Sequence, residues 1–325
     1  MPERTSAFER HPPAAALHRS DPFRKRFQVP VAGGALAVAQ AGAPPEPGRP
    51  VVLALHGMTG THMVYRTIAR ELDRLTPPPS LLVPDLRARG RSADLPGPYG
   101  MAAHMADLIA ILDYVGADRA IVVGHSMGCN IAARFAADHP ERTAAVVLLD
   151  GGLPIMAGQE LGDVDDEEEE PHGIFDRFEL TCATVDEYLG YWRQHPALGP
   201  VWNDDIEAFV RCDFVVDERG VHCIANLDAV LTDVRDLMLD GRTWHAIARA
   251  RAPVRLLRAE RGMYDDDPLL PLPELADTLR ENPHITVEMV EDVNHFTMVL
   301  GGDHGPRRVA ATLAELSLTA CGASH

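Results

Sequence analysis

The sequence predicts an α/β protein with a mostly parallel sheet that is covered by helices on both faces. Short, continuous apolar runs alternate with segments of helical composition, which is typical of strands buried on both faces. This alternation stops between about residues 151 and 249, where aromatic residues with helical spacing follow. One apolar run leads directly into a glycine-flanked serine and then into a helical segment. We therefore expect an α/β core that is interrupted by a helical insertion.

The core is expected over residues 26–155 and 245–325. Residues 1–25 are rich in Pro, Ala and charged residues, which predicts a flexible N-terminal arm. Two apolar stretches between residues 26 and 40 are split by Ala32-Gly33-Gly34, which predicts a hairpin. The buried strands are expected at Val51–Leu55, Leu81–Val83, Ala120–Val123, Ala144–Leu149, Val254–Leu257 and Ile285–Val290.

Residues 156–244 are expected to form a helical cap over the carboxyl ends of the strands, because ligands of open α/β sheets bind there. The acidic run at 163–170 lacks the glycine and the ligand spacing of a calcium loop, so we expect a solvated acidic loop. Most aromatic side chains of the cap should form its own core, and the others should line the pocket. These aromatic residues are Phe175, Phe178, Tyr188, Tyr191, Trp192, Trp202 and Phe209.

The glycine-flanked serine, Ser126, is the candidate nucleophile. The sequence Gly124-His125-Ser126-Met127-Gly128 follows an apolar run and precedes a helix-forming segment, 130–137. This order of strand, turn and helix is what a nucleophile elbow requires. Such a sharp turn strains the backbone at the serine and presses the flanking positions against neighbouring backbone, which explains the glycines.

A serine hydroxyl attacks a carbonyl only with a base to take its proton and an acid to orient that base. His295 directly follows the last apolar run and is the predicted base. The ends of parallel strands share one edge of the sheet, so this histidine can meet Ser126 although they lie far apart in the sequence.

The acid has more than one candidate. We prefer Asp265, which lies three residues after Gly262 in the loop that follows the run at 254–257. Asp150, at the end of the run at 144–149, is the main alternative. The same loop as Asp265 also offers Glu260, Asp266 and Asp267.

Two backbone N–H groups are the predicted donors to an oxyanion. Met127 follows the candidate nucleophile at the start of a helix, where N–H groups are free. Met58 lies in the glycine-rich turn after the run at 51–55. Such donors stabilise the charge that develops on a carbonyl oxygen during acyl transfer.

Taken together, these motifs resemble the α/β-hydrolase superfamily. The matching segments are His56-Gly57-Met58-Thr59-Gly60, Pro84-Asp85-Leu86-Arg87-Ala88-Arg89-Gly90-Arg91-Ser92, Gly124-His125-Ser126-Met127-Gly128 and Asn294-His295. The resemblance implies a mostly parallel eight-stranded sheet and a serine-dependent member similar to esterases and lipases. Ser126 argues against the haloalkane dehalogenases and epoxide hydrolases of this fold, which use Asp as nucleophile. In some members the acid follows the sixth strand, so Asp150 remains open.

The sequence therefore predicts a serine hydrolase that cleaves an ester, thioester, lactone or similar activated carbonyl through an acyl-enzyme. The alternatives are a carbon-carbon bond hydrolase or an acyltransferase with the same triad, or a non-catalytic ligand-binding member of the fold. We expect a small-molecule substrate and neither a metal nor an organic cofactor.

Composition excludes several other classes. The net charge of -18 disfavours nucleic acid and anionic membrane surfaces as partners. Lys25 is the only lysine, which excludes a P-loop lysine or a Schiff-base lysine deeper in the chain. No apolar stretch has the length of a signal peptide or a membrane span, so we expect a cytoplasmic protein. The 5 cysteines are scattered and do not indicate a disulfide framework, and no feature indicates an oligomeric state.

Overall fold

An eight-stranded sheet forms the centre of the protein, with the strand order β1-β2-β4-β3-β5-β6-β10-β11. The computed structural model describes residues 21–153 and 175–322. The strands of the sheet are β1 (Lys25–Val31), β2 (Gly34–Ala41), β3 (Val51–Leu55), β4 (Leu81–Pro84), β5 (Ala120–His125), β6 (Thr143–Leu149), β10 (Val254–Arg261) and β11 (Ile285–Asn294). Each buried strand expected from an apolar run lies within one of them.

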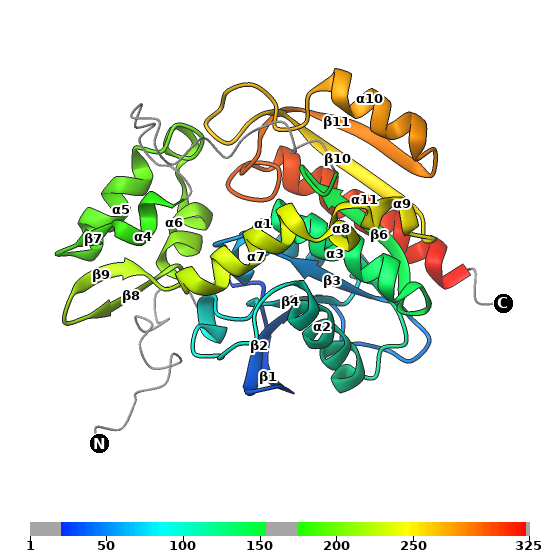
Figure 1. Cartoon of the computed structure of the whole chain (residues 1–325), viewed down its shortest axis with the longest axis horizontal. Helices are drawn as coiled ribbons and strands as arrows, with labels where there is room; N and C mark the ends of the chain where they lie inside the picture. Colours follow the sequence, from blue (N-terminus) through cyan, green and yellow to red (C-terminus); the bar gives the residue numbers. More distant parts are fainter. Residues whose placement is uncertain (1–20, 154–174, 323–325) are drawn as a thin grey trace.

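Strand directions agree with the predicted sheet (Figure 1). The hairpin at Ala32-Gly33 joins β1 and β2, and β2 also pairs with β4 in the antiparallel sense. All other neighbouring strands pair in parallel. The sheet is thus mostly parallel, and the carboxyl ends of its central strands lie at one edge.

Helices cover both faces of the sheet, because alternate strand residues point to opposite sides. Val52 and Ala54 of β3 belong to the cluster that packs on α1 (Arg66–Asp73) and α11 (His304–Gly322). Val51, Leu53 and Leu55, which alternate with them along β3, belong to the opposite cluster. The helices that contribute to this second cluster are α2 (Met101–Val115), α3 (Met127–Asp138), α9 (Ala246–Arg249) and α10 (Leu272–Glu281).

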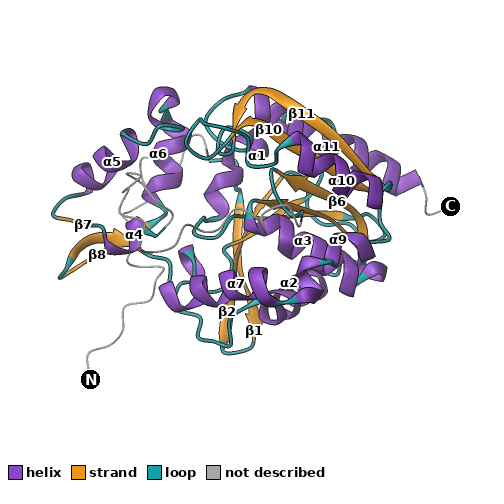
Figure 2. Cartoon of the chain, turned by 45° about the horizontal axis from the view of Figure 1, so that its top comes forward, coloured by secondary structure: helices purple, strands orange, loops and turns teal. Residues whose placement is uncertain are grey.

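A lobe formed by residues 175–226 projects from one side of the sheet (Figures 1 and 2). Its helices are α4 (Asp176–Glu179), α5 (Val185–Arg193) and α6 (Asp204–Arg211). It also contains a three-stranded antiparallel sheet with the order β7-β9-β8, formed by β7 (Thr181–Cys182), β8 (Phe214–Asp217) and β9 (Gly220–Cys223). The insertion was expected to be a helical cap, and this lobe contains a small sheet in addition to its helices. The predicted acidic loop at 163–170 lies outside the described residues.

The end of the expected cap lies on the core instead of in the lobe. Helix α7 (Leu227–Leu239) is fixed to α2, because Asp233 accepts from His104 at 3.1 Å and Asp236 accepts from the backbone N–H of Met101 at 2.8 Å. The short helix α8 (Gly241–Trp244) follows it and contacts α3.

At the N-terminal end of the described chain, residues 21–25 also pack on the core, although the sequence predicted them as part of a flexible arm. The ring of Phe23 is buried at an edge-on angle to His62, with ring centroids 5.3 Å apart. Residues 1–20 lie outside the described residues.

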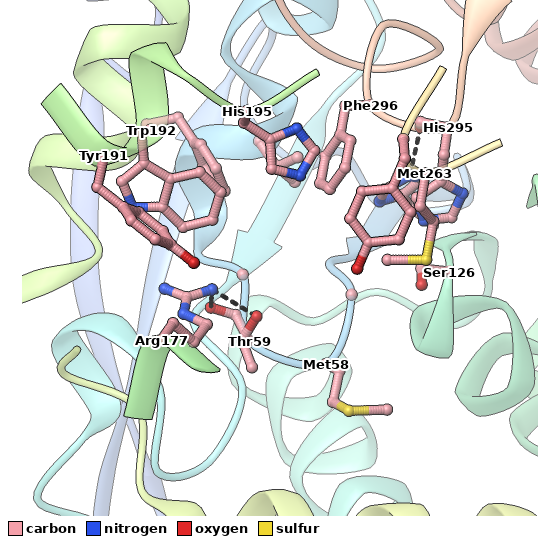
Figure 3. A pocket seen from close by; sticks show the side chains of 16 residues that line it. Met58, Thr59, Ser126, Arg177, Tyr191, Trp192, His195, Met263, His295 and Phe296 are labelled. Carbon is pink, nitrogen blue, oxygen red and sulfur yellow. Dashed lines mark hydrogen bonds between the residues drawn. The ribbon is translucent and has the colours of Figure 1, made fainter. Parts of the chain in front are cut away.

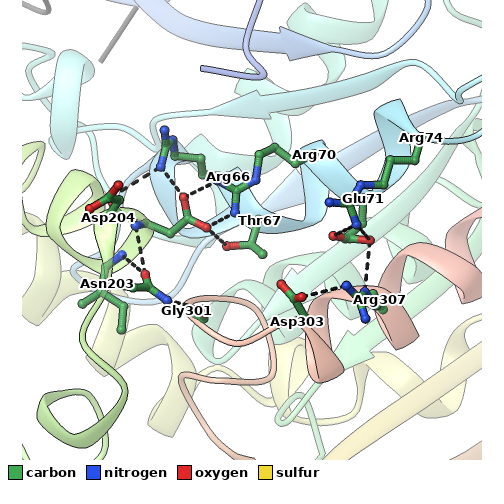
Figure 4. A network of polar contacts seen from close by, with 12 residues as sticks. Arg66, Thr67, Arg70, Glu71, Arg74, Asn203, Asp204, Gly301, Asp303 and Arg307 are labelled. Carbon is green, nitrogen blue, oxygen red and sulfur yellow. Dashed lines mark hydrogen bonds and ion pairs between the residues drawn. The ribbon is translucent and has the colours of Figure 1, made fainter. Parts of the chain in front are cut away.

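A buried carboxylate joins the lobe to the core (Figure 4). Asp205 of α6 accepts from Arg66, from Arg70 at 2.8 Å and from the hydroxyl of Thr67 at 2.9 Å, all three on α1. Next to it, Asn203 donates to the carbonyl of Gly301. The side chains of Arg66 and Asp205 are 2% and 5% exposed, so this ion pair is shielded from solvent.

Replacing Asp205 with alanine is expected to destabilise the protein by about 3 kcal/mol or more, because it leaves a buried guanidinium without its partner. Thermal unfolding should show a drop of roughly 6 to 12 °C. Asp303→Ala is the matched control, since Asp303 forms an ion pair with Arg307 in which both side chains are more than half exposed. Such a pair contributes at most about 1 kcal/mol. Equal melting temperatures for the two variants would contradict the role of Asp205.

Candidate active site

Ser126 lies on a sharp turn between β5 and α3, in a backbone conformation that few non-glycine residues adopt. Its φ is 56° and its ψ is -126°. An added Cβ at Gly124 would lie 2.1 Å from the carbonyl oxygen of Gly128, and one at Gly128 would lie 2.2 Å from that of Leu55. Only glycine fits at these two positions. The strand, turn and helix expected for a nucleophile elbow are therefore present at Ser126.

His295 and Asp150 are hydrogen-bonded to each other. His295 follows β11 directly, and Asp150 follows β6 directly. The Nδ1 atom of His295 lies 2.7 Å from Oδ2 of Asp150, and both side chains are buried. The other carboxylate oxygen accepts from the backbone N–H of Ala259 at 2.9 Å. With the Nδ1 proton directed at the carboxylate, Nε2 is the ring nitrogen left to accept a proton.

Asp265, the acid preferred from the sequence, does not contact His295. Its carboxylate accepts from Nε of Arg261 at 2.7 Å and from Nδ2 of Asn294 at 2.9 Å, and its side chain is 41% exposed. The preference for Asp265 over Asp150 is thus not supported by the geometry, because the partners of Asp265 are the last residues of β10 and β11.

Two of the other three candidate carboxylates are also engaged elsewhere. Glu260 accepts from the backbone N–H of Asp292 at 2.8 Å, and Asp266 accepts from that of Tyr264 at 3.2 Å. Asp267 is exposed. None of them has a described hydrogen bond to His295.

His125 holds the backbone of His295, a role that the sequence did not predict. Its Nε2 donates to the carbonyl oxygen of His295 at 2.9 Å, and the two rings lie 4.5 Å apart between centroids. Burial, reinforced by the neighbouring His295 ring, lowers the pKa of His125 well below its usual value. The side chain therefore acts as a neutral donor that fixes the loop carrying the candidate base.

The turn after β3 lies against Ser126. A Cβ added at Gly57 would lie 3.1 Å from the Cβ of Ser126. Two buried side chains fix this turn. His56 donates from Nδ1 to the Gly57 carbonyl at 2.8 Å and accepts the N–H of Leu86 on Nε2 at 2.9 Å. Arg89 donates from Nε to the carbonyl of Met58 at 3.0 Å.

The second predicted donor, Met127, is the first residue of α3, so its N–H has no partner within the helix. Both predicted donor residues are therefore adjacent in the chain to the turn or the serine: Met58 follows Gly57, and Met127 follows Ser126.

A pocket opens over Ser126 between the core and the lobe (Figure 3). Its empty volume is about 820 Å³, part of which is open to solvent. The core contributes residues 57–60 together with Ser126 and His295. The lobe contributes Arg177 and several rings, and the loops after β10 and β11 contribute others. These rings belong to Tyr191, Trp192, His195, Phe209, Tyr264 and Phe296. Of the aromatic residues singled out in the insertion, Tyr191, Trp192 and Phe209 line the pocket, whereas Tyr188 packs on Phe214.

Within residues 21–153 and 175–322, no group of three His, Cys, Asp or Glu side chains is arranged to hold a metal ion. The same described ranges contain no helix that is long and apolar enough to span a membrane.

The buried His56 makes stability depend on pH. Burial lowers its pKa from 6.5 to about 4, so the unfolded chain binds its proton more readily than the folded one. Stability is therefore lost as the pH falls from about 6.5 to about 4, and the contribution of His56 is about 3 kcal/mol.

Urea unfolding at several pH values between 7.5 and 4 measures this loss. His56→Gln, whose amide can both donate and accept, should show a shallower fall in stability than the wild type. His304→Gln, at an exposed position of α11, controls for the loss of one histidine. The assignment fails if His56→Gln and the wild type lose stability in parallel.

Comparison with known proteins identifies the fold. Residues 50–178 match the family model of the alpha/beta hydrolase fold. A solved E-2-(acetamidomethylene)succinate hydrolase superimposes with a TM-score of 0.69 and 18% identity, covering 90% of this chain and 98% of that one. A thioesterase domain from the curacin biosynthetic pathway gives a TM-score of 0.66 with 18% identity, covering 90% and 99%. The protein thus has the α/β-hydrolase fold, as the sequence predicted.

Similar sequences with curated names match only part of the chain. Lipase LipV of Mycobacterium tuberculosis is 37% identical over 104 residues, which is 32% of this chain and 38% of the lipase. The putative carbamate hydrolase RutD of Caulobacter vibrioides is 38% identical over 109 residues, or 33% and 39% of the two chains. Epoxide hydrolase B of Mycobacterium tuberculosis is 34% identical over 112 residues, or 34% and 31%. The matched segment thus spans less than half the length of these relatives.

Proposed function

We propose that this protein is a serine hydrolase that cleaves a small molecule with an activated carbonyl. The observation that carries this proposal is the bond between His295 and Asp150 at 2.7 Å beside a pocket that Ser126 and His295 both line. A nucleophile, a base and an acid that orients the base are the three groups that acyl transfer by serine needs.

The proposed reaction has two halves. The Oγ atom of Ser126 attacks the carbonyl carbon while Nε2 of His295 takes the hydroxyl proton. Asp150 stabilises the imidazolium, and the N–H groups of Met58 and Met127 donate to the oxyanion. The tetrahedral intermediate then expels the leaving group, which receives the proton from His295, and an acyl-enzyme remains. Water, activated by the same histidine, attacks the acyl-enzyme and releases the acid.

The names of the relatives support a hydrolase but do not define the substrate. A lipase and a putative carbamate hydrolase match segments of 104 and 109 residues of this chain. Epoxide hydrolase B also matches part of this chain. The epoxide hydrolases of this fold use Asp as nucleophile, however, whereas the candidate nucleophile of this chain is Ser126. We therefore favour esters, thioesters, lactones and related carbonyl compounds over epoxides.

The acyl-enzyme can be tested by partitioning. Phenyl butyrate and 4-nitrophenyl butyrate have the same acyl group and different leaving groups, so both give the same acyl-enzyme. In buffer that contains methanol, we expect the two esters to yield one common ratio of butyrate to methyl butyrate. A ratio that depends on the leaving group, or no turnover of ester, thioester or lactone, would contradict the proposal.

A further inference from the structure

The charge of the pocket differs from that of the whole chain. The protein has 48 acidic and 30 basic residues, yet none of the described residues that line the pocket is Asp or Glu. Arg177 is the one Lys or Arg among these described lining residues. Figure 3 shows its guanidinium beside Thr59 and below Tyr191, away from Ser126 and His295. The pocket therefore has a reactive end and a cationic end.

The guanidinium of Arg177 is held in place by contacts with three residues. It forms an ion pair with Asp213, which is completely buried, and donates to the hydroxyl of Thr59 at 2.5 Å. It also lies over the ring of Trp192, 5.1 Å from the ring centroid. Burial alone lowers the pKa of Arg177, but the carboxylate of Asp213 outweighs it and raises that pKa well above the usual value.

A buried ion pair of this kind adds little net free energy of folding, because removing both charges from water costs much of what their attraction contributes. Apolar residues of similar volume often stabilise a protein as well or better. Here the charged group reaches the wall of the cavity. A guanidinium has five N–H donors. Nη1 donates to the hydroxyl of Thr59 at 2.5 Å and to its carbonyl at 3.5 Å, and Nη2 donates to Asp213. Nε, which has no hydrogen-bond partner among the described residues, and one N–H of Nη2 remain for a ligand, side by side in a geometry that suits a carboxylate.

The backbone between the two ends limits the length of the ligand. Gly57 contacts Ser126, and Thr59, which holds Arg177, lies two residues further along the chain. The Cα atoms of Gly57 and Thr59 are therefore at most about 7.6 Å apart. An extended acyl chain of about four to six carbons, with C–C bonds of about 1.5 Å, has a comparable length. Aromatic rings lie between the two ends, with His195 stacked on Trp192 at 5.8 Å between centroids.

We propose that Arg177 binds a carboxylate at the far end of the acyl chain, so that the substrates are monoesters, thioesters or related acyl derivatives of short dicarboxylic acids. This inference rests on the proposed function for the position of the reacting carbonyl. The aromatic middle of the pocket then contacts the methylene or unsaturated carbons of the chain, and the leaving group extends towards the opening.

Kinetics on a matched pair of esters test the inference. Mono-4-nitrophenyl glutarate and 4-nitrophenyl pentanoate have acyl chains of equal length and differ in the terminal carboxylate. We expect the wild type to have a higher kcat/KM for the glutarate, and Arg177→Met to lower that value by about 10-fold to 100-fold. The pentanoate should change by less than about threefold.

Arg193→Met is the matched control. This arginine also belongs to the lobe and also lies over a tryptophan, Trp202, at 5.2 Å, but it does not line the pocket. It should leave kcat/KM for both esters unchanged. Equal losses on both esters in Arg177→Met, or a wild type that does not prefer the glutarate, would overturn the inference. If Arg177→Met does not fold, Arg177→Lys replaces it, with a smaller loss confined to the glutarate.

Calorimetric binding of glutarate itself separates this inference from the proposed function. Glutarate should bind to Ser126→Ala protein, and the additional change Arg177→Met should abolish that binding. Binding that depends on Arg177 without turnover of any ester would retain the carboxylate site and reject the hydrolase. Turnover of the pentanoate without glutarate binding would retain the hydrolase and reject the carboxylate site.

Discussion

Ser126→Ala is expected to lower kcat for ester hydrolysis by at least about 10⁴-fold, because the proposed acyl-enzyme forms on the hydroxyl that this change removes. The fold should survive, since an alanine is smaller than the serine and the glycines at 124 and 128 already accommodate the turn. Steady-state kinetics with 4-nitrophenyl butyrate measure the loss, and circular dichroism checks the fold.

The matched control for this variant is Ser317→Ala. Ser317 lies on α11 and donates its hydroxyl to the carbonyl of Leu313, remote from the pocket. Its removal should leave kcat and KM unchanged. Residual activity of more than about 1% in Ser126→Ala would show that ester turnover does not pass through this serine.

Asp150→Asn is expected to lower kcat by about 10⁴-fold, while Asp265→Asn should lower it by less than about fivefold. The amide at position 150 would donate to Nδ1 of His295 and hold the imidazole in the wrong tautomer. Its other atom can still accept the N–H of Ala259, so the fold should be retained. Asp265 makes its contacts with Arg261 and Asn294, outside the bond between His295 and the acid.

The two aspartate variants control for each other, because both positions follow a strand and both have a positive φ. Parallel kinetics and urea unfolding of the two variants separate loss of chemistry from loss of stability. The assignment of the acid to Asp150 is wrong if Asp265→Asn is the variant that loses activity.

Much of the core follows from local sequence. Strands of a parallel sheet that are buried on both faces consist of continuous apolar residues, and β3, β5 and β6 contain the apolar runs identified in the sequence. The elbow at Ser126 was predictable from its glycines. Any turn of this kind brings the flanking positions so close to neighbouring backbone that only glycine fits there. His295 was predictable as a residue at a strand end, since all parallel strand ends share one edge.

The contact of Asp150 with His295 was not predictable, because it depends on the order of the strands in the sheet. Asp150 and Asp265 both follow strands, and nothing local shows that β6 lies beside β5 and that the loop after β11 folds back over it. The short strands of the lobe were missed for a similar reason. Strands such as Phe214–Asp217 are stabilised by pairing across the small sheet and carry little periodicity of their own.

The polar side chains that support the site were equally hidden in the sequence. Arg177 and Asp213 are distant in sequence and meet only when the lobe folds. The same holds for His125, whose contact with the backbone of His295 is defined by tertiary structure. Such contacts join elements far apart in the chain, so neither composition nor spacing reveals them.

Active-site labelling tests the central claim most directly. A fluorophosphonate reacts with a serine that its neighbours activate, and peptide mapping by mass spectrometry identifies the residue modified. We predict a single phosphonylated position, Ser126, with labelling lost in Ser126→Ala and strongly slowed in Asp150→Asn. A native protein that is not labelled, or is labelled at another residue, would contradict the account.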